Sequence, residues 1–428
     1  MNIKIFEKFI TQCDPQLILL IVDYMMDNKL YDTNSLMRLK FQLLELTERN
    51  DEKSKLADDL HLDENVVEKF GKRMQESKRT YASMYDEIRE FTDIYAEETS
   101  EDSQLPKDCD LWSHLKTSYQ LDDSILQKMY NLAQFSFKCG MLNTANSCLE
   151  ICKSLLPQTR DIYLNCLWGK LTVNILSRNF KDAVFDIRRL NEQIDKMALA
   201  DTPSSIILKQ RSWLIHYSLF VYYRIENGLE HLVNFCLNDK IYLSTLQLLC
   251  PYLMHYITTA ALITSDRKRN IIEDVIRLFD DNSDQTYIDP TGDLIKAVCI
   301  NFDFNNANEL LSRAEEAVAN DFFMCSFVQD FMKSARSLVF ENFCRLHHCV
   351  GIGPVSEQLD LNWDETEAYI LELVKNGRLN AKIDSAKGNI VMEFNTVSPY
   401  ETMMNKFRFL QIKLDAFTNN FEKRSRVY

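Results

Sequence analysis

The stretch NWDETEAYILELVKNGRLNAKIDSAKGNIVMEF, residues 362–394, decides the fold of this chain. Asn362 and Glu365 have the three-residue spacing of a capping box, in which each residue satisfies a free backbone N–H group at the start of a helix. Apolar residues near helical spacing follow from Trp363 to Val374, and Gly377 can adopt the left-handed conformation that ends helices. The first half of the stretch is therefore predicted to be a capped helix.

The second half of this stretch has the pattern of a β-hairpin. Residues 378–384 alternate apolar with polar side chains, residues 386–389 are Ala-Lys-Gly-Asn, and residues 390–394 form a second short apolar run. A short helix is expected at Val355–Leu359, and the helix before it should end near His348. The order helix, helix, helix, hairpin predicts a winged helix over residues 341–400.

The charge of this winged helix argues against DNA recognition. Residues 354–400 contain eight acidic and four basic side chains, a net charge of −4, and the helix that would enter a major groove begins Asp-Glu-Thr-Glu at residue 364. These carboxylates would repel phosphates. An edge strand can instead add to the sheet of a neighbouring protein. The candidate interface at the hairpin edge is Lys382, Asp384, Ile390 and Met392.

Upstream of the winged helix, a helical pattern repeats. A turn is followed by a large apolar residue, a small residue three positions later, and further apolar residues on the same helix face. The copies are Leu142, Ala145, Leu149 and Cys152 after Gly140; Phe180, Ala183, Ile187 and Leu190; and Phe304, Ala307, Leu311 and Ala314. Residues 111–340 are therefore predicted to form a right-handed solenoid of helix pairs similar to tetratricopeptide repeats, whose period is ~34 residues.

Residues 1–110 are predicted to be a separate helical region. Its main feature is a long helix with an apolar stripe, for which packing within the protein is favoured over an intermolecular coiled coil. The stripe consists of Val67, Phe70, Met74, Tyr81, Met84, Ile88, Phe91 and Tyr95. The acidic segment Ala96–Asp110, which contains Pro106, is the best candidate for a linker.

The C-terminal region, residues 401–428, is predicted to be a helix with one apolar face. Apolar residues alternate four and three positions apart along it. They are Met403, Phe407, Leu410, Leu414, Phe417 and Phe421. This stripe could dock on its own domain or form a contact surface for other chains, for instance in a helical bundle.

Composition supports a mainly helical protein. The 428 residues include only 9 Gly and 8 Pro, too few for the turns of a β-rich fold, and 46% are apolar, which suffices for a large core. The most apolar stretch, Trp213–Tyr223, is shorter than the ~20 residues that a membrane span needs, and Met1–Phe9 lacks the apolar core of a signal peptide. We therefore expect a cytoplasmic protein with reduced thiols and no membrane contact.

The sequence lacks the motifs of common enzyme and metal sites. It contains no phosphate-binding glycine loop, no His-Glu-x-x-His, and no His-x-His with a following Asp. Cys344, His347, His348 and Cys349 lie together but lack a second ligand pair at zinc-finger spacing. We therefore expect no enzyme activity, no cofactor and no metal.

Direct RNA contact stays open at small basic clusters, although the net charge of 49 − 63 = −14 excludes attraction through the overall field. Short basic runs are usually solvated helix ends. The clusters are Arg267, Lys268 and Arg269; Arg188 and Arg189; and Lys423 to Arg426.

A helical solenoid that runs into a winged helix resembles the PCI domain, which the proteasome lid, the COP9 signalosome and eukaryotic translation initiation factor 3 share. Several sequence blocks are similar to one PCI component of the initiation factor, whereas residues 1–110 share only its length and helical character. The blocks are Leu167–Leu171, Gln210–His216, Asn301–Phe304, Val318 with Asn320–Phe323, Phe343–Arg345, Ala381–Ser385 and Val397–Tyr400.

The resemblance implies a PCI module over about residues 210–400 and the role of a non-catalytic scaffold. Such a component joins other PCI and MPN subunits and binds the small ribosomal subunit during translation initiation. The alternative is a PCI scaffold subunit of the proteasome lid or the signalosome.

Overall fold

The computed structural model divides the chain into two compact units. Unit 1 comprises Met1–Asn301 with Glu309–Ala335, and unit 2 comprises Phe302–Asn308 with Arg336–Tyr428. Apart from isolated positions, the structure describes residues 3–60, 64–98, 111–119, 123–157, 161–199, 202–264, 289–304, 306–347, 349–353, 362–375, 381–384, 388–392 and parts of 400–414.

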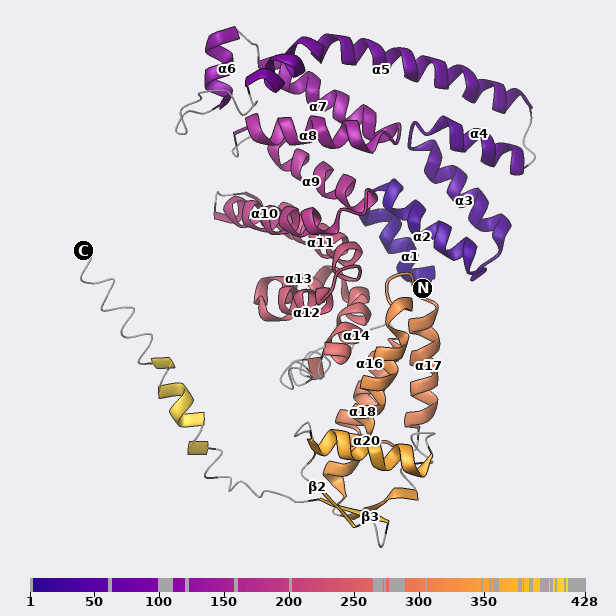
Figure 1. Ribbon diagram of the computed structural model, residues 1–428, viewed down its shortest axis with the longest axis vertical. Helices are drawn as coiled ribbons and strands as arrows, with labels where there is room; N and C mark the ends of the chain where they lie inside the picture. Colours follow the sequence, from indigo (N-terminus) through magenta and orange to yellow (C-terminus); the bar gives the residue numbers. More distant parts are fainter. Residues whose placement is uncertain are drawn as a thin grey trace. The chain divides into compact units, whose positions relative to one another are not determined.

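Unit 1 is a stack of helices (Figure 1). From α7 to α11 each helix packs against the next one in the sequence, so the predicted solenoid of helix pairs is confirmed. Its α-helices are α1 (Ile3–Gln12), α2 (Pro15–Asp27), α3 (Thr33–Glu45), α4 (Asn50–Asp59), α5 (Glu64–Glu98), α6 (Leu111–Tyr119), α7 (Asp123–Lys138), α8 (Leu142–Leu155), α9 (Asp161–Leu176), α10 (Phe180–Leu199), α11 (Ser204–Tyr222), α12 (Gly228–Val233), α13 (Lys240–Leu249), α14 (Met254–Thr264), α16 (Pro290–Ile295) and most of α17 (Ala307–Ala319).

The repeated helices share a turn as well as a buried face. Their small residues Ala145, Ala183 and Ala307 are buried, as the repeat pattern predicts. In each copy the residue two positions before the large apolar residue has a positive φ angle: 80° at Gly140, 59° at Arg178 and 54° at Phe302. Around Gly140 and Arg178 the hydrogen bonds are those of a Schellman motif, which ends one helix and turns the chain into the next.

The long helix α5 packs inside the protein. Phe70, Ile88 and Phe91 of its apolar stripe are buried, and the helix contacts α4 and α7. The intramolecular packing expected for this stripe is therefore confirmed. The proposed linker begins within α5, and its residues 99–110 lie outside the described residues.

The N-terminal helices belong to the core of unit 1. Phe9 of α1 is completely buried, and its ring makes edge-on contacts with His216 and Phe220 of α11 and with Tyr256 of α14. Its ring centroid also lies 5.8 Å from that of Phe323. The described helices between Ile3 and Glu98 and those of the solenoid thus belong to the same compact unit.

Within the described residues, no single helix is long and apolar enough to cross a membrane. The helices Lys240–Leu249 and Pro251–Thr264 would together be long and apolar enough for a membrane span, but the chain bends by 109° between them. Much of this pair belongs to the core of unit 1, because Tyr252–Met254, Tyr256 and Ile257 are all buried.

Unit 2 contains the second half of α18 (Val328–Leu346), strand β1 (Cys349–Gly351), α20 (Trp363–Lys375), β2 (Ala381–Asp384) and β3 (Asn389–Met392). The hairpin β2–β3 and the capped helix α20 confirm the predicted winged helix. The helix expected at Val355–Leu359 falls almost entirely outside the described residues. Strand β1 is an addition that the sequence pattern did not reveal.

The shared turn predicts the effect of glycine in the solenoid. A left-handed conformation strains any side chain with a Cβ atom, so Arg178→Gly should raise the free energy of unfolding by about 0.5–1 kcal/mol. The matched control is Arg188→Gly at an exposed position within α10, which should lower it by about 1 kcal/mol because glycine is a poor helix former. Urea unfolding of both variants measures the two effects, and equal destabilisation would contradict the assigned turn.

A buried histidine should make unit 1 sensitive to acid. His216 Nδ1 donates to the carbonyl oxygen of Ser212 at 2.7 Å, so its Nε2 accepts from the hydroxyl of Tyr252, also at 2.7 Å. Burial lowers the pKa of His216 to about 4. Below its ordinary pKa of about 6.5, the unfolded chain takes up a proton that the folded protein does not, and stability is lost as the pH falls.

We predict that between about pH 7 and pH 5.5 the wild-type protein loses about 1 kcal/mol more stability than the His216→Gln variant. His255 contributes in the opposite sense: burial alone would lower its pKa, but the charge and hydrogen bond of Asp289 raise it. The stability from that pair is lost as the pH rises through the raised pKa, so only the difference between the two proteins is diagnostic. Urea unfolding at both pH values measures these losses. Equal losses in the wild-type protein and in His216→Gln would show that His216 does not titrate in this way.

Candidate subunit interface

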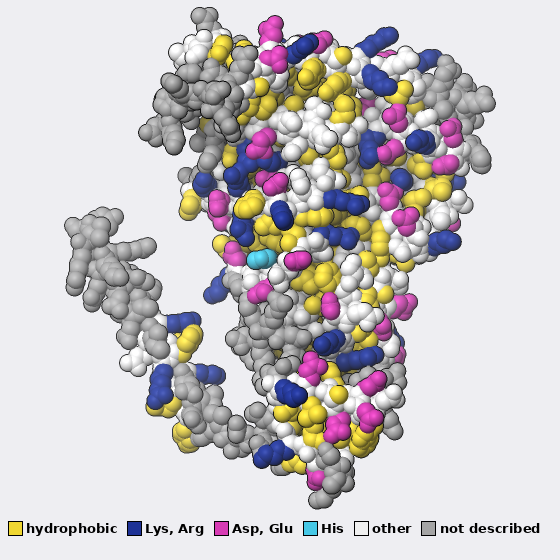
Figure 2. All heavy atoms as spheres, in the orientation of Figure 1, with side chains coloured by type: hydrophobic (Ala, Val, Ile, Leu, Met, Phe, Trp, Pro, Cys, Tyr) yellow, Lys and Arg dark blue, Asp and Glu magenta, His cyan; other side chains and the backbone are white. Residues whose placement is uncertain are grey.

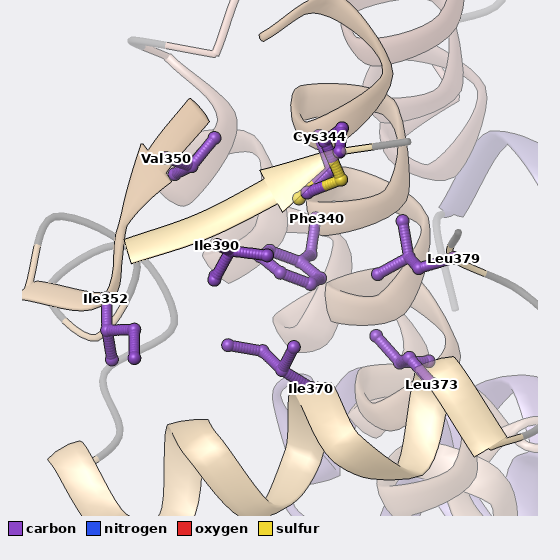
Figure 3. Close-up of a cluster of buried hydrophobic side chains, with 9 residues drawn as sticks. Phe340, Cys344, Val350, Ile352, Ile370, Leu373, Leu379 and Ile390 are labelled. Carbon is purple, nitrogen blue, oxygen red and sulfur yellow. The ribbon is translucent and has the colours of Figure 1, made fainter. Parts of the chain in front are cut away.

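The winged helix is held together by one apolar core (Figure 3). Side chains from α18, β1, α20 and β3 converge on it. They are Phe340 and Cys344 from α18, Val350 from β1, Ile370 and Leu373 from α20, Ile390 and Met392 from β3, and Ile352 and Leu379 from the connections. Burial raises the pKa of the Cys344 thiol to about 12, which keeps it protonated. No cluster of metal-ligating side chains occurs among the described residues, and Cys344 is a core residue.

The start of α20 shows the Glu365 bond of the predicted capping box, followed by the first backbone bond of the helix. The backbone N–H of Asn362 donates to the carboxylate of Glu365 at 3.2 Å, and the backbone N–H of Thr366 donates to the carbonyl oxygen of Asn362 at 2.8 Å. The first turn exposes Asp364 and Glu365. The surface that would face a DNA groove is therefore acidic, as the sequence predicts.

The turn of the hairpin lies against the same helix. Gly388 has a φ of 63°, and a Cβ atom there would come within 2.7 Å of the Trp363 ring. Both the backbone conformation and the close approach of the ring therefore require glycine at this position. Trp363 thus anchors the turn between β2 and β3 to the first residue of α20.

The sheet order corrects half of the predicted edge interface. The three strands lie in the order β1-β3-β2, so β3 is the middle strand and β2 is an outer one. Ile390 and Met392 belong to β3 and are buried in the core, which excludes them from the edge. Lys382 and Asp384 do lie on the outer strand β2, where the side chain of Lys382 is exposed.

The register shows which backbone groups of β2 point outward. The N–H of Ile352 donates to the carbonyl oxygen of Gly388, so these two residues form a hydrogen-bonded pair. The pair Val350–Ile390 lies two positions further along the same two strands. Hydrogen-bonded pairs alternate along antiparallel strands, so the backbone of Ile390 faces β1 and that of Val391 faces β2. Lys382, the partner of Val391, therefore bonds inward.

Ala381 and Ile383 consequently direct their backbone N–H and C=O groups away from β3. In the described part of the chain β2 pairs with β3 alone. These two residues, flanked by the side chains of Lys382 and Asp384, form the outer edge of the sheet. A strand from another protein would find its hydrogen-bond partners there.

The predicted C-terminal stripe is exposed. The described positions between Met403 and Leu414 are helical, and the side chains of Met403, Phe407, Leu410 and Leu414 are 60–65% exposed. Phe417 and Phe421, predicted to continue the stripe, lie outside the described residues. We use the name C-terminal stripe for Met403, Phe407, Leu410 and Leu414.

The basic clusters receive little structural description. Arg267, Lys268 and Arg269 lie outside the described residues, as does the cluster from Lys423 to Arg426. Arg188 and Arg189 are exposed on α10 of unit 1. Figure 2 shows one face of the molecule, on which basic and acidic side chains are interspersed. Contact of these clusters with RNA stays a prediction.

Two family models match the chain. The model described as eIF3 subunit 6 N terminal domain matches residues 4–136, and the PCI domain model matches residues 303–394. The first match corrects the expectation that residues 1–110 resemble the initiation-factor component only in length and helical character.

Relatives of similar length show the same similarity. The chain is 30% identical over 421 residues to the E subunit of eukaryotic translation initiation factor 3 from Bombyx mori, and the alignment covers 97% of this chain and 94% of the relative. The E subunits of the same factor from Culex quinquefasciatus and Aedes aegypti are 30% identical over 415 residues, with the same coverage of each chain.

The direction of the backbone groups on β2 predicts the effects of proline. Ala381→Pro removes an outward donor at the first residue of an edge strand, where proline is tolerated, and should change the free energy of unfolding by less than about 1 kcal/mol. Lys382→Pro removes an inward bond of the hairpin and should cost at least about 1 kcal/mol. Thermal unfolding compares the variants, and a more stable Lys382→Pro protein would reverse the assigned directions.

Proposed function

Because the chain belongs to the family formed by the E subunits of eukaryotic translation initiation factor 3, we propose that it is a scaffold subunit that holds other PCI and MPN subunits of this factor and contacts the small ribosomal subunit. The observation that carries this proposal is the length of the similarity. It spans 97% of the chain and 94% of the relative, so the N-terminal helices, the solenoid and the winged helix all have counterparts. Membership in this family replaces the alternative assignment to the proteasome lid or the signalosome.

Two surfaces of unit 2 are suited to contacts with other subunits. The first is the outer edge of β2, which offers the backbone groups of Ala381 and Ile383. The second is the C-terminal stripe, in which Phe407 and Leu414 are each 65% exposed. A helix with a regular apolar stripe gains most by packing against further helices, so we assign this surface to a bundle with other subunits.

Catalysis has no support in the residues. The sequence contains none of the phosphate-binding or zinc-protease motifs sought above, and the buried His216 and His255 are both engaged with core side chains. We therefore propose a non-catalytic subunit that acts in the cytoplasm, where translation initiation takes place. Its contribution would be to fix the relative positions of its neighbours.

A double substitution in the C-terminal stripe tests the assembly surface. Phe407→Asp with Leu414→Asp places two charges in the apolar seam and should reduce recovery of the other subunits at least about tenfold in a pull-down. The isolated protein should keep its melting temperature, because both side chains are exposed. The Ala381→Pro variant, in the same assay, tests the edge of β2.

The control for the stripe is Phe409→Asp, the same chemical change on the opposite side of the helix. It should leave recovery near the wild-type level. Full recovery of all subunits with the double variant would refute the stripe as an interface. Mass spectrometry of the recovered chains checks the family assignment, since initiation-factor subunits and ribosomal proteins are expected.

RNA contact forms a separate arm of the same experiment. Binding through Arg267, Lys268 and Arg269 would weaken steeply as salt rises, whereas an apolar seam would respond little. A steep salt dependence of ribosome association that is lost when these residues are replaced by Ser would assign the contact to RNA.

A further inference from the structure

A groove of about 330 Å³ crosses α7, α9 and α11 in unit 1. Aromatic residues from all three helices line it: Tyr130 and Phe137 come from α7, Trp168 from α9, and Trp213 and Tyr217 from α11. Figure 1 shows α7, α9 and α11 as alternate helices of the stack, and solenoid proteins form extended binding surfaces from such repeated elements. The groove is distinct from the edge of β2 and from the C-terminal stripe, which belong to unit 2.

The aromatic rings are held in a fixed arrangement. The ring of Trp168 stands edge-on to that of Trp213, with centroids 6.2 Å apart, and to that of Tyr217 at 5.2 Å. Trp168 Nε1 donates to the side-chain oxygen of Gln210 at 2.7 Å, which fixes the indole plane. Both indoles are only partly buried. The π faces of such rings carry negative potential, which attracts cations.

One of these rings already attracts a cation. The ammonium of Lys209 lies 5.1 Å from the centroid of Trp213, within the range of a cation–π contact. Lys209 is not among the residues that line the groove. The contact shows that the indole can bind a positive charge in the folded protein. The described lining itself contains no lysine or arginine.

Among the described residues that line the groove, Asp14 carries the only charge. Its Oδ1 accepts the backbone N–H of Gln16 at 2.9 Å and caps α2, and its own N–H donates to the hydroxyl of Tyr217 at 3.3 Å. Burial raises the pKa of the Asp14 carboxyl, because the carboxylate is poorly solvated there. A cation in the groove would compensate for this lost solvation.

We propose that this groove binds an arginine side chain carried by a segment of a partner protein. A guanidinium is planar and weakly hydrated, which suits stacking on an indole such as that of Trp168 or Trp213, and its charge complements the carboxylate of Asp14 in the same groove. The phosphates of RNA would instead meet a carboxylate on a chain of net charge −14, which favours a protein partner. This inference does not depend on the contacts proposed for unit 2.

Short peptides test the proposal with the full-length chain. The probe is a heptapeptide of glycine and serine with one central arginine, and binding is followed by the fluorescence of the tryptophans. The control peptides carry citrulline, which has the same shape without the charge, or leucine. The arginine peptide should bind at least about tenfold more tightly than either control.

Substitution of Asp14 separates its charge from its capping role. Asparagine caps helices as well as aspartate does, so Asp14→Asn should keep the fold and weaken arginine-peptide binding about tenfold. The matched control is Asp32→Asn, the same change at the N-cap of α3 and outside the groove, which should leave binding unchanged. Trp213→Leu provides a second variant and should abolish the arginine preference.

Several results would overturn the proposal. Equal binding of the arginine and citrulline peptides would show that the groove does not recognise the positive charge. A lack of saturation up to about 10 mM arginine peptide would show that there is no binding site. Unchanged binding in both Asp14→Asn and Trp213→Leu would place the peptide elsewhere. A uridine decamer that binds the wild-type chain but not Trp213→Leu would assign the groove to RNA.

Discussion

The burial of Phe9 is the contact on which the architecture of unit 1 depends. Its ring lies among the aromatic side chains of His216, Phe220, Tyr256 and Phe323, so a residue of the first helix joins segments more than two hundred positions away. Removing a buried phenylalanine commonly costs about 3–5 kcal/mol, a large part of the stability of a domain. The same contact brings the turn after α1 to the solenoid, where Asp14 bonds to Tyr217. The N-terminal helices are therefore a structural part of the scaffold, and they supply Gln12 and Asp14 to the lining of the aromatic groove.

Unit 2 uses its apolar residues in two different ways. Those of α18, α20 and β3 are buried in one small core, and the hairpin is held against α20 by the contact of Gly388 with Trp363. The residues between Met403 and Leu414 remain at the surface. A winged helix whose groove-facing helix begins with carboxylates gains nothing from nucleic acid, but the edge of its sheet and an apolar helix are both suited to protein contacts. The charge of the module and its exposed surfaces therefore favour the same class of partner.

The sequence reveals the elements of this fold better than their contacts. Helix α20, the hairpin and the repeated helices could be predicted because capping, alternation and apolar spacing are local signals. The turn at Gly140 was visible for the same reason, whereas Arg178 adopts the same conformation with no glycine to signal it. Ile390 and Met392 were assigned to the edge because the pattern of a hairpin does not reveal a third strand, and β1 is too short to show alternation. The aromatic groove was missed altogether, since Asp14, Trp168 and Trp213 are brought together only by long-range packing.

The exposure of the C-terminal stripe has a further consequence for assembly. Short helices are marginally stable in water by themselves, and the apolar side chains of Phe407, Leu410 and Leu414 are largely exposed to solvent. Packing against helices of other subunits, as proposed above, would supply both the buried area and the constraint that fixes the helix. A partner that binds only the folded helix stabilises it, and tighter binding gives a larger stabilisation. The solenoid has no such requirement, because its helices bury their apolar faces against one another within a single chain. On this reasoning, formation of the complex would be the step that fixes the C-terminal helix.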